Sequence, residues 1–167
     1  REPRDEMRQL ADTDYLTGLP NRRAGLRELG VQIERARAEG APLVIGFLDI
    51  DLFKEINDRH GHDTGDAVLQ AVAGALRGAL RGRDEVFRMG GEEFLLVLPG
   101  GPGGVGAVLQ RIRAAVRSKC LDARTLTFSA GVAHHRPGEG AEALLARADL
   151  ALYEAKRAGR DRDVAAD

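Results

Sequence analysis

The sequence is poor in three features that mark particular classes of protein. Cys120 is its one cysteine, so no intrachain disulfide can form and a reducing compartment, the cytoplasm, is expected. Its apolar runs are far too short to span a bilayer, and no signal peptide is visible. The formal net charge is −1, so no global field favours binding to nucleic acid or an anionic membrane.

The composition is that of an ordinary soluble globular protein. The chain has 167 residues, 43% hydrophobic and 31% charged, which is enough for one domain with a proper core. It opens with Arg1 rather than Met, from which we expect a fragment of a longer protein, whose other regions could anchor it to a membrane. Its four histidines and one cysteine show no spacing typical of a zinc site.

Apolar periodicity predicts an alternation of helices and strands. The expected helices cover 5–12, 22–39, 52–59, 66–81, 105–119 and 141–158, and the expected strands cover 43–48, 85–88, 94–98 and 125–133. Asn21 is a plausible N-cap, Gly40 a helix end, and residues 161–167 are expected to be frayed. Because two strands form a hairpin, we expect an α+β or mixed α/β fold, with a mostly antiparallel sheet flanked by helices.

The hairpin is the part of the chain most suggestive of a site. Gly90 and Gly91 lie between two strands, where a tight turn needs positive φ and another molecule can approach the backbone closely. Glu92 and Glu93 follow at once, at the start of a buried strand. The pattern favours a metal–phosphate site, and the alternative is an ordinary surface hairpin with solvated glutamates.

A second acidic position closes the first predicted strand. Asp49 follows six apolar residues at a strand end, where α/β proteins commonly bind ligands, whereas Asp51 is interpreted as the N-cap of the next helix. If this strand lies beside the hairpin, Asp49, Glu92 and Glu93 converge. Such oxygen ligands suit Mg²⁺ or Mn²⁺.

Three cations are candidate phosphate ligands. These are Lys54, Lys156 and Arg160, the last two spaced i,i+4 and expected to share one helix face. The alternative for that pair is a solvated helix end, whose cations interact with the C-terminal dipole.

Four segments in order resemble the GGDEF family of diguanylate cyclases. Asp14 to Arg23 resembles D-x-L-T-G-L-x-N-R-R, and Asp49 to Asp66 resembles D-[IV]-D-x-F-K-x-[IV]-N-D…G-H-x-x-G-D. Gly90 to Phe94 resembles GG[DE]EF, and Ala148 to Arg160 resembles A-D-x-A-L-Y-x-A-K…G-R. The resemblance covers almost the whole chain.

The resemblance implies a palm-like nucleotidyl cyclase fold and a reaction. Two GTP molecules would condense to cyclic di-GMP with loss of two pyrophosphates, at the interface of a homodimer, under control of a sensor domain outside this chain. The implied organisation is the end of a linker helix over 1–13, the cyclase domain over 14–161 and a frayed tail over 162–167. The alternatives are a catalytically silent module that binds GTP or cyclic di-GMP as a receptor, and a pure dimerisation module.

The resemblance also implies roles for individual residues. The metal ligands would be the carboxylates of Asp49, Glu92 and Glu93 and the main-chain carbonyl of Ile50. Glu92 would in addition accept the proton of the attacking 3′-hydroxyl. The substrate-binding positions would be Asn57, His62 and Asp66, of which Asn57 and Asp66 would contact the guanine, together with Phe53, Lys54, Lys156 and Arg160 around the phosphates.

A further short motif resembles the inhibitory site of the family. Five residues separate Asp84 from Gly90, and in that register Arg81 and Asp84 would bind cyclic di-GMP as a feedback inhibitor. The alternative interpretation is a charged turn between a helix and a strand.

Overall fold

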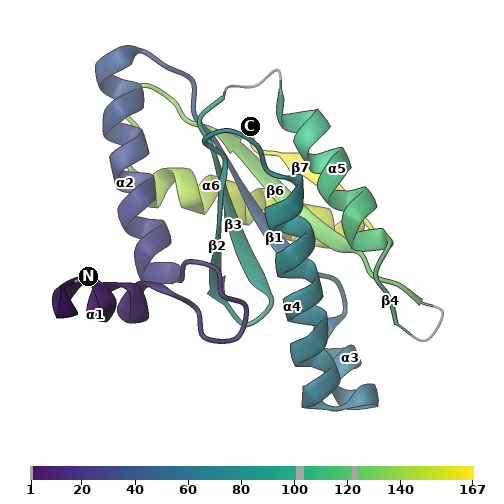
Figure 1. The fold of residues 1–167 in the computed structure, drawn as a ribbon. Coiled ribbons are helices and arrows are strands. Elements are labelled where there is room, and N and C mark those ends of the chain that lie inside the picture. Colours follow the sequence, from purple (N-terminus) through teal and green to yellow (C-terminus); the bar gives the residue numbers. More distant parts are fainter. Residues whose placement is uncertain (1, 101–103, 122–123) are drawn as a thin grey trace.

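The computed structural model describes residues 2–100, 104–121 and 124–167, arranged around one main sheet (Figure 1). The helices are α1 Pro3–Asp12, α2 Arg22–Glu39, α3 Phe53–His60, α4 His62–Ala79, α5 Val105–Arg117 and α6 Ala141–Arg157. The strands are β1 Val44–Ile50, β2 Glu85–Gly90, β3 Glu93–Leu98, β4 Cys120–Leu121, β5 Arg124–Thr125, β6 Phe128–His134 and β7 Asp163–Ala165. Within these described parts, no helix combines the length and apolar character that a membrane span requires.

The main sheet has five strands in the order β2-β3-β1-β6-β7. The pairs β2·β3, β3·β1 and β1·β6 are antiparallel, and only the β6·β7 pair at the edge is parallel. Helices α2 and α6 cover one face and α4 and α5 cover the other, as Figure 1 shows. The predicted mixed α/β class with a mostly antiparallel sheet is therefore confirmed.

The central strand β1 is buried on both faces. Val44, Leu48 and Ile50 pack with α4 and α5, whereas Ile45 and Phe47 pack with α2 and α6. A strand that is buried on both faces has a nearly continuous run of apolar residues, and the sequence of β1 has this pattern. Since successive side chains alternate, Asp49 belongs to the face that α6 covers.

The boundaries of α2 agree with the capping signals in the sequence. The Asn21 side chain accepts a hydrogen bond from the Ala24 N–H at 3.1 Å, and Gly40 ends the helix with φ 63°. Helix α4, in contrast, begins at His62, four residues before the expected start, so the predicted turn up to Asp66 is wrong. Gly65 lowers the local helix propensity, but tertiary packing keeps the segment from His62 onward helical.

The C-terminal tail is not frayed, which corrects the expectation for residues 162–167. Residues 163–165 form β7, held by hydrogen bonds from the Ala130 N–H to the Arg162 carbonyl and from the Ala166 N–H to the Val132 carbonyl. Arg113 of α5 forms an ion pair with Asp163 across the sheet edge. These partners lie far away in sequence, so local periodicity could not reveal the strand.

A glycine in β6 allows α6 to lie close to the sheet. A side chain at Gly131 would place its Cβ 2.1 Å from the carbonyl oxygen of Ala148 and 2.3 Å from the nitrogen of Leu152. Only glycine fits such a backbone approach. The approach brings the C-terminal part of α6, with Lys156, over the end of β1.

Candidate functional site

The structure brings the predicted carboxylates together at one end of the sheet. Asp49 and Glu93 are direct partners across the β1·β3 pair, and Glu92 lies in the turn just before β3. The Ile50 N–H donates to the Glu92 carbonyl at 3.3 Å, which continues the pairing into this turn. This placement was the condition that the sequence left open.

Asp49 is a buried carboxylate in a crowded electrostatic environment. It is 5% exposed, and its Oδ2 accepts a hydrogen bond from Lys156 Nζ at 2.6 Å. Burial is the main cause that raises the pKa of Asp49 to about 6; Lys156 opposes this, and Glu92 and Glu93 add to it. The pKa of Glu93 is also raised, mainly by burial and then by Asp149.

The donor atoms at this end of the sheet are suited to a hard divalent cation. Carboxylate and carbonyl oxygens are the ligands that Mg²⁺ and Mn²⁺ prefer, and Lys156 supplies positive charge beside them in this structure. Among the described residues, no three His, Cys, Asp or Glu side chains already surround one point closely enough to hold a metal. The chemistry of the donors therefore fits Mg²⁺ or Mn²⁺, without a preassembled ligand cluster.

The turn that carries Glu92 is fixed by an arginine that the sequence analysis missed. Arg88 donates to the Gly91 carbonyl through Nη2 at 2.9 Å and forms an ion pair with Asp14 at 3.1 Å. Gly90 and Gly91 have φ 143° and 50°, as the hairpin prediction required. Arg88 thus links Asp14 to the Gly90–Gly91 turn, which is far away in sequence.

Helix α3 begins immediately beside the carboxylates. No side chain caps its N-terminus, where Phe53 is buried and Lys54 is exposed, so first-turn N–H groups have no side-chain acceptor. The interpretation of Asp51 as the N-cap is wrong. Leu52 occupies the cap position with φ 57°, and the Asp51 carboxylate accepts from the Thr127 and Ser129 hydroxyls instead.

Asn57, His62 and Asp66 lie on α3 and the first turns of α4. His62 and Asp66 are one turn apart on α4 and both are exposed. Asn57 Oδ1 is buried and has no hydrogen-bond partner. A Cβ on Gly65 would lie 1.8 Å from that oxygen, so Gly65 is the residue that makes room for Asn57. The sequence signal was the glycine before Asp66, whose role was not recognised.

We predict that Gly65→Ala displaces Asn57 and destabilises the domain. The added methyl group cannot coexist with Asn57 Oδ1, and overpacking costs about 1–3 kcal/mol. The matched control is Gly74→Ala on the same helix, where an added Cβ would meet no atom within 4 Å apart from the adjoining helix backbone, and it should stabilise by up to about 1 kcal/mol. Chemical denaturation of both variants measures the difference, and equal effects would contradict the steric argument.

The structure corrects the expected placement of Arg160. Helix α6 ends at Arg157, so Lys156 and Arg160 do not share a helix face. Arg160 has φ 64° in the turn that follows, and its N–H donates to the Ala155 carbonyl at 3.0 Å. This turn reverses the chain toward β7, and it leaves Arg160 exposed and Lys156 half-buried on Asp49.

Arg81 and Asp84 lie together in the turn between α4 and β2. The Asp84 N–H donates to the Arg81 carbonyl at 3.1 Å, and Gly82 has φ 60°. Both side chains line a hollow of about 280 Å³, together with Arg77, Pro20 and neighbouring residues. This turn is at the end of α4 opposite to His62 and Asp66, as Figure 1 shows.

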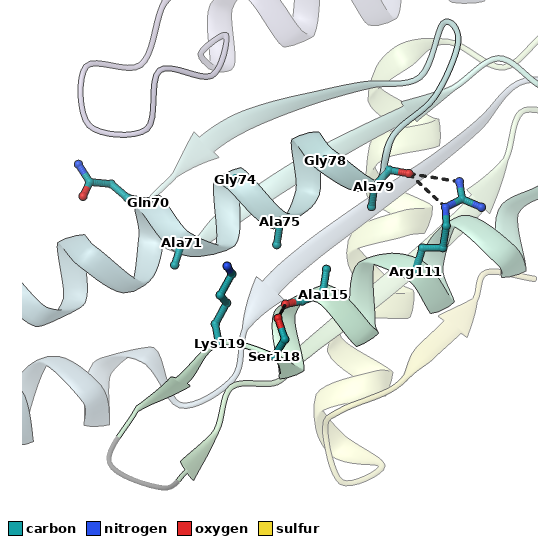
Figure 2. Close-up of a pocket in the computed structure, with 10 residues that line it drawn as sticks. All are labelled: Gln70, Ala71, Gly74, Ala75, Gly78, Ala79, Arg111, Ala115, Ser118 and Lys119. Atoms are coloured by element: carbon teal, nitrogen blue, oxygen red, sulfur yellow. Dashed lines mark hydrogen bonds between the residues drawn. The ribbon is translucent and has the colours of Figure 1, made fainter.

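A separate hollow of about 470 Å³ lies between α4 and α5 (Figure 2). Small residues of α4, among them Gly74 and Gly78, face Arg111 and Lys119. The Arg111 guanidinium is bonded to the Ala79 carbonyl at 3.2 Å. None of the predicted site residues lines this hollow.

Comparisons with known proteins agree on one family. The family model described as "Diguanylate cyclase, GGDEF domain" matches residues 11–162. The diguanylate cyclase DgcP of Pseudomonas aeruginosa is 45% identical over 163 residues, 95% of this chain and 24% of DgcP. The chain thus spans about a quarter of the length of that relative.

Two solved structures are similar over nearly the whole chain. One is diguanylate cyclase SiaD in complex with its activator SiaC from Pseudomonas aeruginosa, with TM-score 0.89, 44% identity, and 98% of this chain and 66% of that chain covered. The other is the coiled coil and GGDEF domain of DgcB from Caulobacter crescentus in complex with c-di-GMP. Its TM-score is 0.92 at 37% identity, with 97% of this chain and 89% of that chain covered.

Proposed function

Because this chain belongs to the GGDEF domain family, we propose that it is the catalytic domain of a diguanylate cyclase. It would condense two GTP molecules into cyclic di-GMP with release of two pyrophosphates. The observation that carries the proposal is the meeting of Asp49, Glu92 and Glu93 at one end of β1 and β3, beside Lys156 and the uncapped start of α3. A cytoplasmic location and control by a sensor domain in a longer protein are parts of the same proposal.

The metal would be held at the end of β1 and β3, where the carboxylates meet. Its ligands would be the carboxylates of Asp49, Glu92 and Glu93 and the carbonyl of Ile50. When bound, Mg²⁺ or Mn²⁺ would neutralise charge on the triphosphate and on the departing pyrophosphate. Release of Asp49 from Lys156 would free both groups, the carboxylate for the metal and the ammonium for a phosphate.

Glu92 would act as the general base. Its carboxylate would accept the proton of the 3′-hydroxyl that attacks the α-phosphate of the second GTP. Such a group must be held in place, and Arg88 restrains the turn by its bond to the neighbouring Gly91 carbonyl.

The phosphates would be bound at the start of α3, and the base would be bound near its later part and the start of α4. The N–H groups of Leu52, Phe53 and Lys54 at the helix start suit anionic oxygens, with Lys54, Lys156 and Arg160 supplying positive charge. Asn57 and Asp66 would contact the guanine, and His62 would lie at a further substrate-binding position. A carboxylate at Asp66 accepts from adjacent guanine N1–H and N2–H₂ donors, an arrangement that adenine does not offer.

The direct test is incubation with GTP and Mg²⁺, with the product identified by mass. Cyclic di-GMP is expected at the mass of two GMP units joined by two phosphodiester bonds. Binding of GTP or cyclic di-GMP without turnover, at protein concentrations that permit dimerisation, would instead support a silent receptor module.

Condensation of two identical substrates suggests two identical half-sites. Each subunit would present one GTP across a two-fold axis, so the reaction would depend on dimerisation. We predict that specific activity rises with protein concentration and rises further when a coiled coil is fused ahead of α1, because linking raises the effective concentration. Activity assays across a hundredfold dilution, paired with sedimentation, measure this; a flat profile from a monomer would contradict it.

We also propose feedback inhibition through Arg81 and Asp84. Arg81→Ala should weaken inhibition by added cyclic di-GMP at least about tenfold, because a charge-assisted hydrogen bond contributes about 1.5–3 kcal/mol. The initial rate should change little. The matched control is Arg83→Ala in the same exposed turn, which should remain inhibited. Equal inhibition of both variants would show that Arg81 and Asp84 belong to an ordinary charged turn without a binding role.

A further inference from the structure

The carboxylate of Asp51 is buried at the junction of three parts of the site. It is 8% exposed and follows Asp49 and Ile50 directly. Its Oδ1 accepts from the Ser129 hydroxyl at 2.6 Å, and its Oδ2 accepts from the Thr127 hydroxyl at 2.7 Å. The Asp51 N–H donates to the Thr127 carbonyl at 3.0 Å, so its backbone is held as well.

The same carboxylate also holds the turn after α6. Asp51 Oδ2 accepts from the Asp161 N–H at 3.0 Å, across 110 positions of sequence. Gly159, Arg160 and Asp161 all have positive φ, at 122°, 64° and 47°. Two consecutive left-handed residues with side chains are unfavourable for an isolated chain, so surrounding contacts must maintain this conformation.

A second set of contacts holds the turn from the other side. The Asp161 carboxylate forms ion pairs with Arg113 at 2.7 Å and with Arg117 at 2.6 Å, both from α5. Arg113 also donates to the Phe128 carbonyl at 2.7 Å and lies over the Phe128 ring at 4.0 Å. The Asp161 backbone is thus fixed by Asp51, and its side chain is fixed by α5.

We propose that Asp51 is a positioning residue that fixes the turn bearing Arg160 relative to the carboxylate of Asp49. The inference rests on the proposed function, in which Arg160 binds a phosphate of GTP. Asp51 is joined covalently to the acidic segment and by a hydrogen bond to the residue after Arg160. It would therefore set the distance between the cation and the carboxylates, while its own oxygens accept from Thr127, Ser129 and Asp161.

The first measurement is the steady-state kinetics of Asp51→Ala with GTP and Mg²⁺. Loss of the anchor should raise KM for GTP about tenfold or more, with a smaller change in kcat, because a phosphate contact made equally in the ground and transition states is weakened. Asp51→Asn should largely preserve KM, since its amide oxygen can still accept from Asp161 while its NH₂ faces the Ser129 hydroxyl. The matched control is Thr127→Val, which removes one donor and leaves the bond to Asp161 intact.

The decisive measurement is a double-mutant cycle with Arg160→Ala. If Asp51 acts through Arg160, Asp51→Ala should change KM far less in the Arg160→Ala background than in the parent. An equal fold-change in both backgrounds would show general destabilisation and would overturn the proposal. If Asp51→Ala does not fold, Asp51→Leu, which fills the space of the side chain but cannot accept from the Asp161 N–H, takes its place in the cycle.

The results with the parent protein distinguish failure of this proposal from failure of the proposed function. A parent that forms no cyclic di-GMP and binds no GTP in calorimetry would show that the proposed function has failed. An active parent whose cycle shows no coupling between the two positions would overturn the role of Asp51 alone.

Discussion

Glu92→Gln should abolish condensation of GTP while largely sparing GTP binding. The substitution keeps the size of the side chain and removes its ability to accept a proton. Loss of a general base costs about 10²–10⁴-fold in rate, and loss of a charged metal ligand adds to it. Initial rates of cyclic di-GMP formation and calorimetry with GTP measure the two effects separately.

The hairpin offers a matched control for Glu92. The signature that this segment resembles accepts Asp or Glu at the same position, so Glu92→Asp keeps the carboxylate and should remain active. A Gln variant that turns over within about tenfold of the parent would show that Glu92 is not the base, since even weak general-base effects exceed that ratio.

Asp49→Asn should abolish activity without lowering the stability of the fold. The rate should fall at least about hundredfold, because a metal contact stabilises the transition state by several kcal/mol. The pKa of Asp49 is raised from 3.8 to about 6, so folding is disfavoured as this group ionises between those pH values. Asparagine removes that cost near neutral pH, and Lys156, with a side chain 37% exposed, can be hydrated instead.

Thermal melting with and without Mg²⁺ and GTP tests the Asp49 prediction. The variant should melt no lower than the parent in plain buffer and should lose the stabilisation that Mg²⁺ with GTP gives the parent. The control is Asp58→Asn, an exposed carboxylate on α3, which should behave as the parent does. A large fall in melting temperature would instead mark Asp49 as a structural residue.

The elements that could be predicted from the sequence are those whose signals are local. Helix α2 is bounded by two local signals, the N-cap Asn21 and the terminating Gly40. The central strand β1 is marked by its continuous apolar run. The start of α4 and the strand β7 could not be predicted in this way. Their stability comes from packing and from partners such as Arg113, which lie many positions away in sequence.

The same division applies to the site. The pairing of Asp49 with Glu93 was expected once the two strands were assumed to be neighbours, and the structure places them so. Asp51 was misinterpreted because Leu52 occupies the cap position with positive φ and the Asp51 carboxylate bonds to hydroxyls far away in sequence. Arg160 was misplaced because it lies in a turn in which two consecutive residues with side chains have positive φ. Statistical preferences argue against such a turn, and its contacts with Asp51 and with α5 hold it in place.

The length of α4 bears on whether the proposed feedback inhibition would be competitive with GTP. The helix has 18 residues and is about 27 Å long, with Asp66 near one end and Arg81 just past the other. Cyclic di-GMP bound at the proposed Arg81 site would not occupy the space in which GTP is proposed to bind beside Asp66 of the same chain. The product would therefore lower the maximal rate without competing for substrate, so excess GTP would not restore activity, and a cell could limit its cyclic di-GMP whatever its GTP supply.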